Sequence, residues 1–346
     1  MNERVVLVVG GCGYIGSHVV KCLLERGCRV VVLDDLSTGH RDALLGGELV
    51  VGSYGDAGLA RAVLARWPID GVIHLGGLSA VAESVVAPAR YYEANVAHTL
   101  TLLSEVRPRP VVFSSSAAIF GGGGGDDQGG PGGAIGEGRV PAPSCPYGAS
   151  KAMVERVLVD FDRAYGLRSI ALRCFNAAGA DRLARIGERH EPETHLIPLA
   201  IAAAMGGEPL TVSGRDHGTP DGTCVRDYVH VDDLAEAHVL ALEALWDGAR
   251  STVFNLGTGL GHSVAEVIAT VAAVVGQDVP TREGARRAGD VARLVADPRR
   301  SAAELGWVPR SSGLRTIVED AWRWHRARFA MTRPDMTTRI SAQTGV

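Results

Sequence analysis

Short runs of apolar, mostly β-branched residues recur along the first half of the chain. They occupy residues 4–10, 28–35, 71–77, 110–116 and 168–176. Between them, segments such as 17–27 and 91–106 place apolar residues at helical spacing. Alternation of strand and helix predicts βαβ units and a parallel sheet, and nearly all-apolar strands indicate a sheet covered on both faces. The pattern therefore predicts an α/β fold with a doubly wound parallel sheet.

The regular alternation loosens after residue 176 into loops, prolines and short strands. We expect residues 1–176 to form a first domain. Residues 177–326 should form a smaller mixed α/β region, with some segments returning to the core. Residues 121–138 are too rich in glycine to hold regular structure, so a flexible loop is expected there. Residues 327–346 lack sustained periodicity and are expected to form a flexible tail.

Composition narrows the class of partner. The chain has 346 residues, 46% of them hydrophobic and 21% charged, with a net charge of −4. These values are typical of a globular protein and do not favour nucleic acid as a partner. No segment has the roughly 18 consecutive apolar residues that would predict a membrane span. The six cysteines are widely scattered, which does not indicate a disulfide framework, so we expect the protein to reside in the reducing cytoplasm. The sequence contains neither C-x-x-C nor H-E-x-x-H, so no standard zinc site is expected.

A glycine-rich turn follows the first predicted strand. Gly10, Gly13 and Gly16 form G-x-x-G-x-x-G, a variant of the dinucleotide fingerprint, in which a pyrophosphate approaches bare backbone and a helix N-terminus. About 20 residues on, the second strand ends at Asp34, whose carboxylate can accept hydrogen bonds from a ribose 2′-OH. Asp34 and Asp35 would repel a 2′-phosphate. The first domain is therefore predicted to be a Rossmann-type domain that binds NAD rather than NADP.

A tyrosine and a lysine stand four positions apart at 147 and 151, just after Pro146. If Pro146 opens a helix, Tyr147 and Lys151 lie one turn apart on the same face. An ammonium near a phenol favours the phenolate, and a downward pKa shift of about 3 units is worth roughly 4 kcal/mol. The pair predicts a general base, although an exposed tyrosine beside a solvated lysine has the same spacing.

Together with Ser114–Ser116 at the end of a strand, these motifs resemble those of the extended short-chain dehydrogenase/reductases. Within that superfamily the chain is similar to the UDP-galactose 4-epimerase family, and the similarity extends to about residue 325. Four further segments carry it: 77–96, 175–180, 221–238 and 286–297.

The resemblance implies NAD-dependent interconversion of UDP-glucose and UDP-galactose, or of their N-acetylated analogues, through a transient 4-keto sugar. It implies that Tyr147 is the acid and base at the sugar 4-OH, that Lys151 polarises it and binds the nicotinamide ribose, and that Ser116 hydrogen-bonds O4. It also implies a homodimer in which the helix after residue 146 and the helix at about 93–106 form the interface.

The resemblance further implies two sets of binding residues and no metal. The cofactor set is Gly10, Gly13, Tyr14, Ile15, Gly16, Asp34, Asp35, Ser53, Tyr54, Leu75, Gly76, Gly77, Asn95, Ser114, Tyr147 and Lys151. The substrate set is Ser116, Asn176, His195, Leu196, Ser213, Arg226, Arg287, Asp290 and Leu294. In the second set, Asn176, Arg226, Arg287 and Asp290 are expected to hold the nucleotide diphosphate and ribose.

Some positions depart from the family pattern. Related sugar-nucleotide dehydratases carry an Asp-Glu pair after the catalytic Ser or Thr, whereas Ala117 and Ala118 follow Ser116 here, so epimerisation is preferred to elimination. Ser53 replaces the aspartate that meets the adenine amine. Ser213 replaces an aromatic residue that stacks on uracil, and Leu294, of intermediate bulk, takes the position that limits substituents at the sugar C2.

Two other functions stay open on sequence alone. One is a related enzyme that oxidises C4 of another substrate, either a UDP-glucuronate epimerase or decarboxylase or an epimerase of dTDP- or CDP-sugars. The other, more remote, is a non-catalytic dinucleotide-sensing protein, because a fold does not fix a function.

Overall fold

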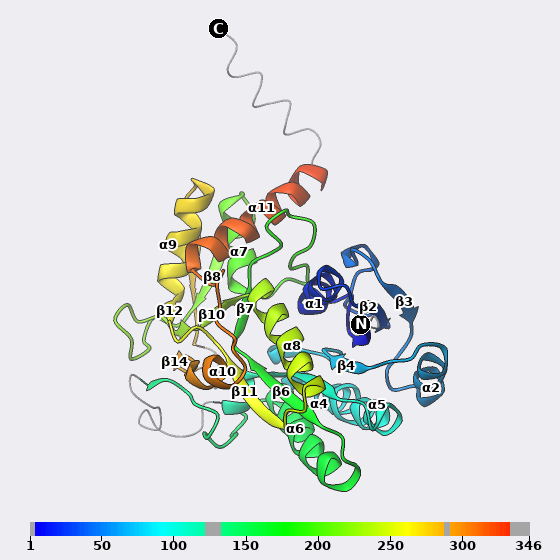
Figure 1. The fold of residues 1–346 in the computed structure, drawn as a ribbon. Helices are drawn as coiled ribbons and strands as arrows, with labels where there is room; N and C mark the ends of the chain where they lie inside the picture. The colour runs from blue at the N-terminus through cyan, green and yellow to red at the C-terminus, as the bar shows by residue number, and fades with distance from the viewer. Residues whose placement is uncertain (1–3, 122–132, 287–290, 333–346) are drawn as a thin grey trace.

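A computed structural model describes residues 4–121, 133–286 and 291–332. Within these ranges, a seven-stranded sheet lies at the centre (Figure 1). Its strands are all parallel and run in the order β11 (Thr252–Leu256), β6 (Ser169–Cys174), β5 (Val111–Ser116), β4 (Gly71–His74), β1 (Val5–Val9), β2 (Arg29–Asp34) and β3 (Glu48–Val51). The predicted doubly wound parallel sheet is thus confirmed.

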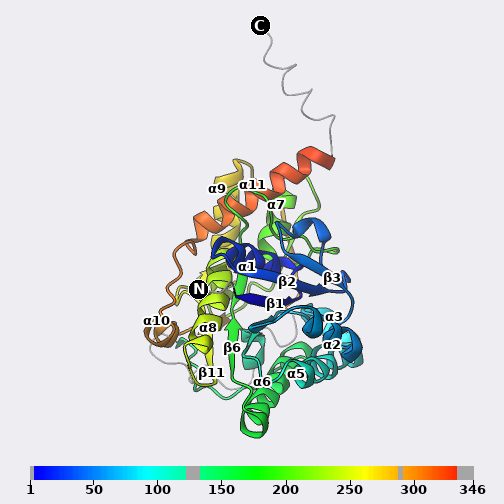
Figure 2. The same cartoon turned by 45° about the vertical axis from the view of Figure 1, so that its right-hand side comes forward.

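Helices cover both faces of this sheet (Figure 2). One face packs against α1 (Tyr14–Glu25) and α8 (Val231–Trp246). The other packs against α2 (Ala57–Arg66), α5 (His98–Val106) and α6 (Pro146–Tyr165). All five residues of β1 are buried, which explains why this strand lacks the polar alternation of a one-sided sheet.

Short elements connect the strands of this first half. They are the 3₁₀ turns η1 (Arg41–Ala43) and η3 (Ala117–Phe120), the helices α3 (Val81–Val86) and α4 (Pro88–Tyr92), and a π-helical turn, η2 (Glu93–Ala97). The segment predicted as one helix at 91–106 therefore contains a π turn, which shifts the helix phase at Asn95.

A further hydrophobic cluster, separate from those on the two faces of the sheet, forms the core at the other end of the molecule. Its helices are α7 (Leu196–Ala204), α9 (Val264–Val275) and α11 (Leu314–Thr332), which pack against one another. Small sheets accompany them: β7 (Asn176–Ala178) with β10 (Tyr228–His230), β8 (Leu210–Ser213) with β13 (Thr281–Gly284), and β9 (Val225–Arg226) between β12 (His262–Ser263) and β14 (Arg293–Leu294). The helix α10 (Arg299–Glu304) lies near β11 (Figure 1).

The expected boundary at residue 176 does not divide the structure into two separate parts, because later segments return to the central sheet. Both α8 and β11 come from beyond that residue, yet they pack on α1 and pair with β6, respectively. The expected tail also begins later than residue 327, because α11 continues to Thr332 and Phe329 packs against its hydrophobic cluster. Residues 333–346 lie outside the described ranges.

The glycine-rich loop is only partly described, since residues 122–132 fall outside the described ranges. Its second part is anchored rather than free. Ile135 is buried and forms an isolated bridge with Ala296, and the Glu137 carboxylate accepts a hydrogen bond of 2.8 Å from the Asn255 backbone N–H. These contacts tie residues 135–137 to the core, which differs from the flexible loop expected there.

No helix among the described residues combines the length and the apolar character that crossing a membrane requires.

Candidate active site

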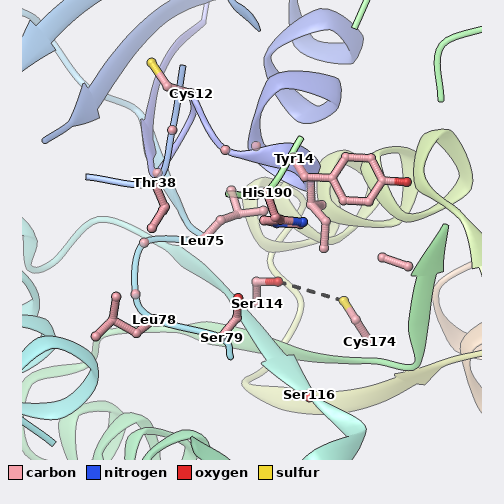
Figure 3. A pocket seen from close by; sticks show the side chains of 18 of the residues that line it. Cys12, Tyr14, Thr38, Leu75, Leu78, Ser79, Ser114, Ser116, Cys174 and His190 are labelled. Carbon is pink, nitrogen blue, oxygen red and sulfur yellow. Dashed lines mark hydrogen bonds between the residues drawn. The ribbon is translucent and has the colours of Figure 1, made fainter. Parts of the chain in front are cut away.

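A cavity of about 690 Å³ opens at the carboxyl ends of the central strands (Figure 3). Gly10 follows β1, Leu75 follows β4, and Ser114 and Ser116 stand at the end of β5, and all of them line it. β1 lies between β2 and β4, so the order of the strands along the sheet reverses at β1. Ligands of open α/β sheets bind at this kind of switch point.

Two of the predicted glycines are required by close backbone approach. Gly10 has φ of +79°, and a Cβ atom there would lie 2.6 Å from the backbone nitrogen of Gly76. A Cβ atom at Gly16 would overlap the carbonyl oxygen of Gly10. Both positions exclude side chains, so the turn leaves bare backbone on this wall of the cavity.

The N-terminus of α1 faces the same turn. Its N-cap is Gly13, which has no side chain to accept from the first N–H groups of the helix. Those groups and the positive end of the helix dipole favour an anion such as a pyrophosphate. The bare turn and the uncapped helix start therefore fit the predicted dinucleotide.

Asp34 has a structural role besides the predicted one. Its carboxylate accepts hydrogen bonds from the backbone N–H groups of Cys12 (2.9 Å) and Leu36 (2.8 Å), which ties the glycine-rich turn to the end of β2. Burial raises the pKa of this carboxyl, although the two N–H donors oppose the shift. Asp34 and the exposed Asp35 both line the cavity, as a ribose-binding pair would require.

Tyr147 and Lys151, near the start of α6, line the same cavity as the glycines. Pro146 is the first residue of that helix, as the sequence predicts. The Lys151 ammonium donates a hydrogen bond of 2.8 Å to the Ser114 carbonyl oxygen and lies 6.0 Å from the centre of the Tyr147 ring. Ser116, at the end of β5, completes the predicted catalytic group.

The expected depression of the Tyr147 pKa is not what the protein alone provides. Burial raises the pKa of Tyr147 to about 12, and the Ser116 hydroxyl opposes this only in part. Burial also lowers the pKa of Lys151 to about 8. The spacing correctly placed the two residues on one face, but exclusion of water outweighs the ammonium. A further positive charge in the cavity is needed to favour the phenolate.

A buried ion pair fixes α6 against the sheet behind these groups. The guanidinium of Arg173 on β6 lies 2.8 Å from the carboxylate of Glu155 on α6, and the hydroxyl of Ser115 donates to the same carboxylate at 2.6 Å. Each of these three side chains is at most a tenth exposed. The pair holds the helix that carries Tyr147 and Lys151 in register with β5 and β6.

Asn95 supports the cavity from outside it. From the π turn it accepts from the Leu78 N–H (2.8 Å) and donates to the Leu78 carbonyl oxygen (3.0 Å) and to Ser150 (3.0 Å). Asn95 is buried, whereas Leu78 lines the cavity. It is therefore a positioning residue for the segment after β4 and for the helix of Tyr147.

Most of the predicted residues meet in the cavity. Those that line it are Gly10, Gly13, Tyr14, Ile15, Gly16, Asp34, Asp35, Tyr54, Leu75, Gly76, Gly77, Ser114, Ser116, Tyr147, Lys151, Asn176, His195, Arg226 and Leu294. Four do not line it: Ser53, Asn95, Leu196 and Ser213. Ser53 accepts from the Gly55 N–H beside Tyr54, Leu196 packs in the cluster of α7, and Ser213 ends β8 beside Gly284. Arg287 and Asp290 lie outside the described residues.

The sequence did not single out several other lining residues. They include Cys12, Thr38, His40, Glu188, Arg189 and His190. Of these, Cys12, Thr38 and His190 are labelled in Figure 3. Residues 188–190 belong to the loop between β7 and α7, which ion pairing of Arg189 with Asp42 (2.6 Å) brings over the loop after β2. The dense polar stretch at 188–195 was the available signal for them.

These features are those of a dinucleotide-binding enzyme of the Rossmann type with a tyrosine and a lysine in the wall of its cavity. Comparison with known proteins gives the family. The model of the NAD dependent epimerase/dehydratase family matches residues 6–257, and the chain belongs to that family.

The proteins to which this chain is similar match it over most of their length. The UDP-glucose 4-epimerase of Azospirillum brasilense is 46% identical, with 93% of this chain and 92% of the relative covered. The crystal structure of UDP-glucose 4-epimerase from Brucella ovis in complex with NAD is 45% identical with a TM-score of 0.88, covering 93% and 98%. That of the Bifidobacterium longum UDP-glucose 4-epimerase with NAD⁺ and UDP is 34% identical with a TM-score of 0.85, covering 94% and 98%.

Proposed function

We propose that the protein is an NAD-dependent nucleotide-sugar 4-epimerase that interconverts UDP-glucose and UDP-galactose. The observation that carries the proposal is that Ser116, Tyr147 and Lys151 line the same cavity as the glycine turn. The names of the similar proteins support the same reaction and the same nucleotide.

The fit to NAD is supported by the bare backbone at Gly10 and Gly16, the uncapped α1 and the acidic end of β2. Bound in this cavity, NAD would supply reversible hydride transfer at the sugar C4. The protein supplies orientation, exclusion of water and proton transfer.

Proton transfer falls to Tyr147. Its hydroxyl, whose pKa burial raises to about 12, holds its proton firmly in the protein alone. A positive charge held beside Tyr147, as an oxidised nicotinamide would provide, would favour the phenolate because opposite charges attract. Tyr147 then accepts the 4-OH proton and later returns it, while Ser116 is placed to hydrogen-bond the same oxygen. Lys151, with its pKa near 8, keeps a positive charge close to the tyrosine at neutral pH.

The sugar is limited by Leu294, which lines the cavity at the end of β14. A side chain of this intermediate size is compatible with a hydroxyl at C2, and whether an N-acetyl group also fits is decided by assaying N-acetylated substrates. Ser213 does not line the cavity, so it is not placed to contact a uracil base there.

Replacement of Tyr147 by Phe tests the function. Tyr147→Phe should nearly abolish turnover and leave NAD bound, because only the proton-carrying oxygen is removed. Products from UDP-galactose, UDP-N-acetylgalactosamine, UDP-glucuronate and the dTDP and CDP equivalents are resolved by chromatography. Tyr165→Phe, an exposed position at the end of the same helix, is the matched control. Undiminished turnover by Tyr147→Phe would remove Tyr147 from the mechanism.

We also propose a homodimer formed through α5 and α6. Leu100 on α5 and Met153 and Val159 on α6 expose apolar side chains, as an interface between two copies would use. Light scattering after size exclusion should give a dimer for the native chain and a monomer for Met153→Lys, whereas Val308→Lys, at an exposed site elsewhere, should stay dimeric. A cytoplasmic location is part of the same proposal.

A further inference from the structure

Four side chains of the loop between β7 and α7 converge on one point. Glu188, His190, Glu193 and His195 follow the spacing E-x-H-x-x-E-x-H. One nitrogen or oxygen atom from each lies within 4.8 Å of those of the other three. Nδ1 of His195 is 2.7 Å from Oε1 of Glu188, and Nδ1 of His190 is 3.2 Å from the same oxygen.

The central atoms of this cluster lack hydrogen bonds despite these short distances. The Glu188 side chain is only 5% exposed, and neither its Oε1 atom nor Nδ1 of His190 has a hydrogen-bond partner. This buried carboxylate oxygen has two imidazole nitrogens within 3.2 Å but no aligned hydrogen bond, and a cation placed among the three groups would satisfy all of them.

We propose that Glu188, His190, Glu193 and His195 bind one divalent transition-metal ion, for which Zn²⁺ is the best match. Two imidazole nitrogens and two carboxylate oxygens are a donor set that Zn²⁺ accepts. Zinc lies about 2.0–2.2 Å from such donors, so any two of them lie at most about 4.4 Å apart. The observed spread of up to 4.8 Å requires only a small inward movement of side chains.

The surrounding structure holds the cluster in place. The Trp324 indole N–H donates to the carbonyl oxygen of Glu188 (2.9 Å), and the backbone N–H groups of Thr194 and His195 fix one oxygen of Glu193. The ring of His190 meets the Tyr14 ring edge to face, with centroids 6.3 Å apart. Such supporting contacts orient ligands before the ion arrives.

The rival explanation is a set of ion pairs with no metal. In the metal-free protein, burial lowers the histidine pKa values, but Glu188 and Glu193 outweigh it and raise the pKa of His190 to about 9 and that of His195 to about 10. Each imidazolium then balances a carboxylate. The two explanations differ in whether the protein takes up a stoichiometric ion, which makes them separable.

The site lies in a useful place. Glu188, His190 and His195 also line the main cavity, and Figure 3 shows His190 beside Tyr14 at that cavity. Half of the His195 side chain is exposed, so an ion held there would keep a coordination position open to water or to a ligand oxygen in the cavity. The proposal does not depend on epimerase activity, because it concerns metal uptake alone.

Titration with Zn²⁺ against a chromophoric chelator tests it. The NAD-loaded full chain, stripped with EDTA and desalted, should bind one Zn²⁺ per chain. In the same protein Co²⁺ should give the visible absorption of a four- or five-coordinate ion. Glu188→Gln combined with His190→Gln should weaken Zn²⁺ binding by more than the roughly 10- to 100-fold that loss of a supporting partner costs. His262→Gln, a partly exposed histidine elsewhere, should bind as the native chain does.

A second variant protects the test against misfolding. His195→Gln alters a half-exposed side chain, so the fold should persist, as circular dichroism would verify, and Zn²⁺ binding should still weaken and the Co²⁺ spectrum change. The proposal fails if the native chain takes up no stoichiometric Zn²⁺. It also fails if the cluster variants bind Zn²⁺ as tightly as the His262→Gln control.

Discussion

The ammonium nitrogen of Lys151 lies 2.8 Å from the backbone carbonyl oxygen of Ser114, within a buried wall of the cavity. The bond joins the helix that carries Tyr147 to the strand that carries Ser116. It also keeps a cation where water is excluded, which is why the Lys151 pKa falls to about 8.

Replacing this lysine should therefore separate activity from stability. Lys151→Met removes the cation beside Tyr147, and turnover should fall by roughly 10²- to 10⁴-fold, the usual range for assistance to acid–base catalysis. The free energy of unfolding should be unchanged or higher, because a buried charge is removed. Steady-state kinetics and urea denaturation measure the two quantities. Arg156→Met, exposed on the same helix, is the control, and full activity of Lys151→Met would contradict the assignment.

The glycine turn offers a test with an internal reference. Gly10→Ala and Gly27→Ala both place alanine at a positive φ, +79° and +76°, but only at Gly10 does the new Cβ atom meet backbone, that of Gly76. Gly27→Ala should cost about 1–2 kcal/mol of stability and keep NAD. Gly10→Ala should cost more and lose NAD on desalting. Equal stability and equal NAD retention in the two variants would show that the approach of Gly10 to Gly76 is unimportant.

Asn95 should affect the cofactor without touching the cavity. Asn95→Ala leaves both backbone groups of Leu78 without their partner, at a cost of about 1–3 kcal/mol. We expect weaker NAD binding, because the segment after β4 loosens, measured as a higher dissociation constant in a fluorescence titration. Thr101→Ala, on the following helix, removes one exposed hydrogen bond and should change neither quantity. Unaltered NAD affinity in Asn95→Ala would refute the positioning role.

The ion pairs of Lys21 should make the free energy of unfolding depend on pH. Its ammonium on α1 pairs with Asp181 (3.0 Å) and Asp232 (2.7 Å). Burial raises the pKa of Asp232, but its bonds to His18 and Lys21 outweigh this and hold that pKa at about 2. The folded pKa lies below the unfolded value of 3.8, so this contribution is complete above about pH 4 and is lost as the pH falls towards 2.

Lys21→Met should therefore lower the free energy of unfolding by roughly 3 kcal/mol near pH 7. It removes the ammonium that Asp181 and Asp232 share, which leaves them with Arg185 and His18, respectively. The difference from the native chain should shrink as the pH falls from about 4 to 2. Denaturation at a series of pH values measures it. Arg156→Ala, which breaks an exposed pair with Asp160, should cost at most about 0.5 kcal/mol at any pH. A pH-independent loss in Lys21→Met would contradict the ion-pair explanation.

The inner strands of the sheet were predictable because both of their faces are covered. Each of β1, β2, β4, β5 and β6 reads as an apolar run. The two strands that the pattern missed, β3 and β11, are the edges of the sheet. β3 has four residues, none of them fully buried, so its sequence carries little strand signal.

The residues of the candidate site were likewise predictable only in part. Gly10, Asp34, Tyr147 and Lys151 belong to local motifs whose spacing fixes their positions, and all of them line the cavity. The loop of Glu188 and His190 reaches the cavity only through contacts with distant residues such as Trp324, which spacing cannot reveal. The raised pKa of Tyr147 escaped prediction for a related reason, because helical spacing fixes a face but not the access of water to it.

The return of α8 and β11 to the central sheet makes the two halves of the chain one cooperative unit. A fragment that stops at residue 176 would leave one edge of β6 unpaired and the apolar face of α1 uncovered. Such a fragment would be prone to associate through that edge rather than fold alone. During synthesis, the cofactor-binding turn is therefore completed long before the scaffold beneath it, which is finished only once residue 256 has emerged.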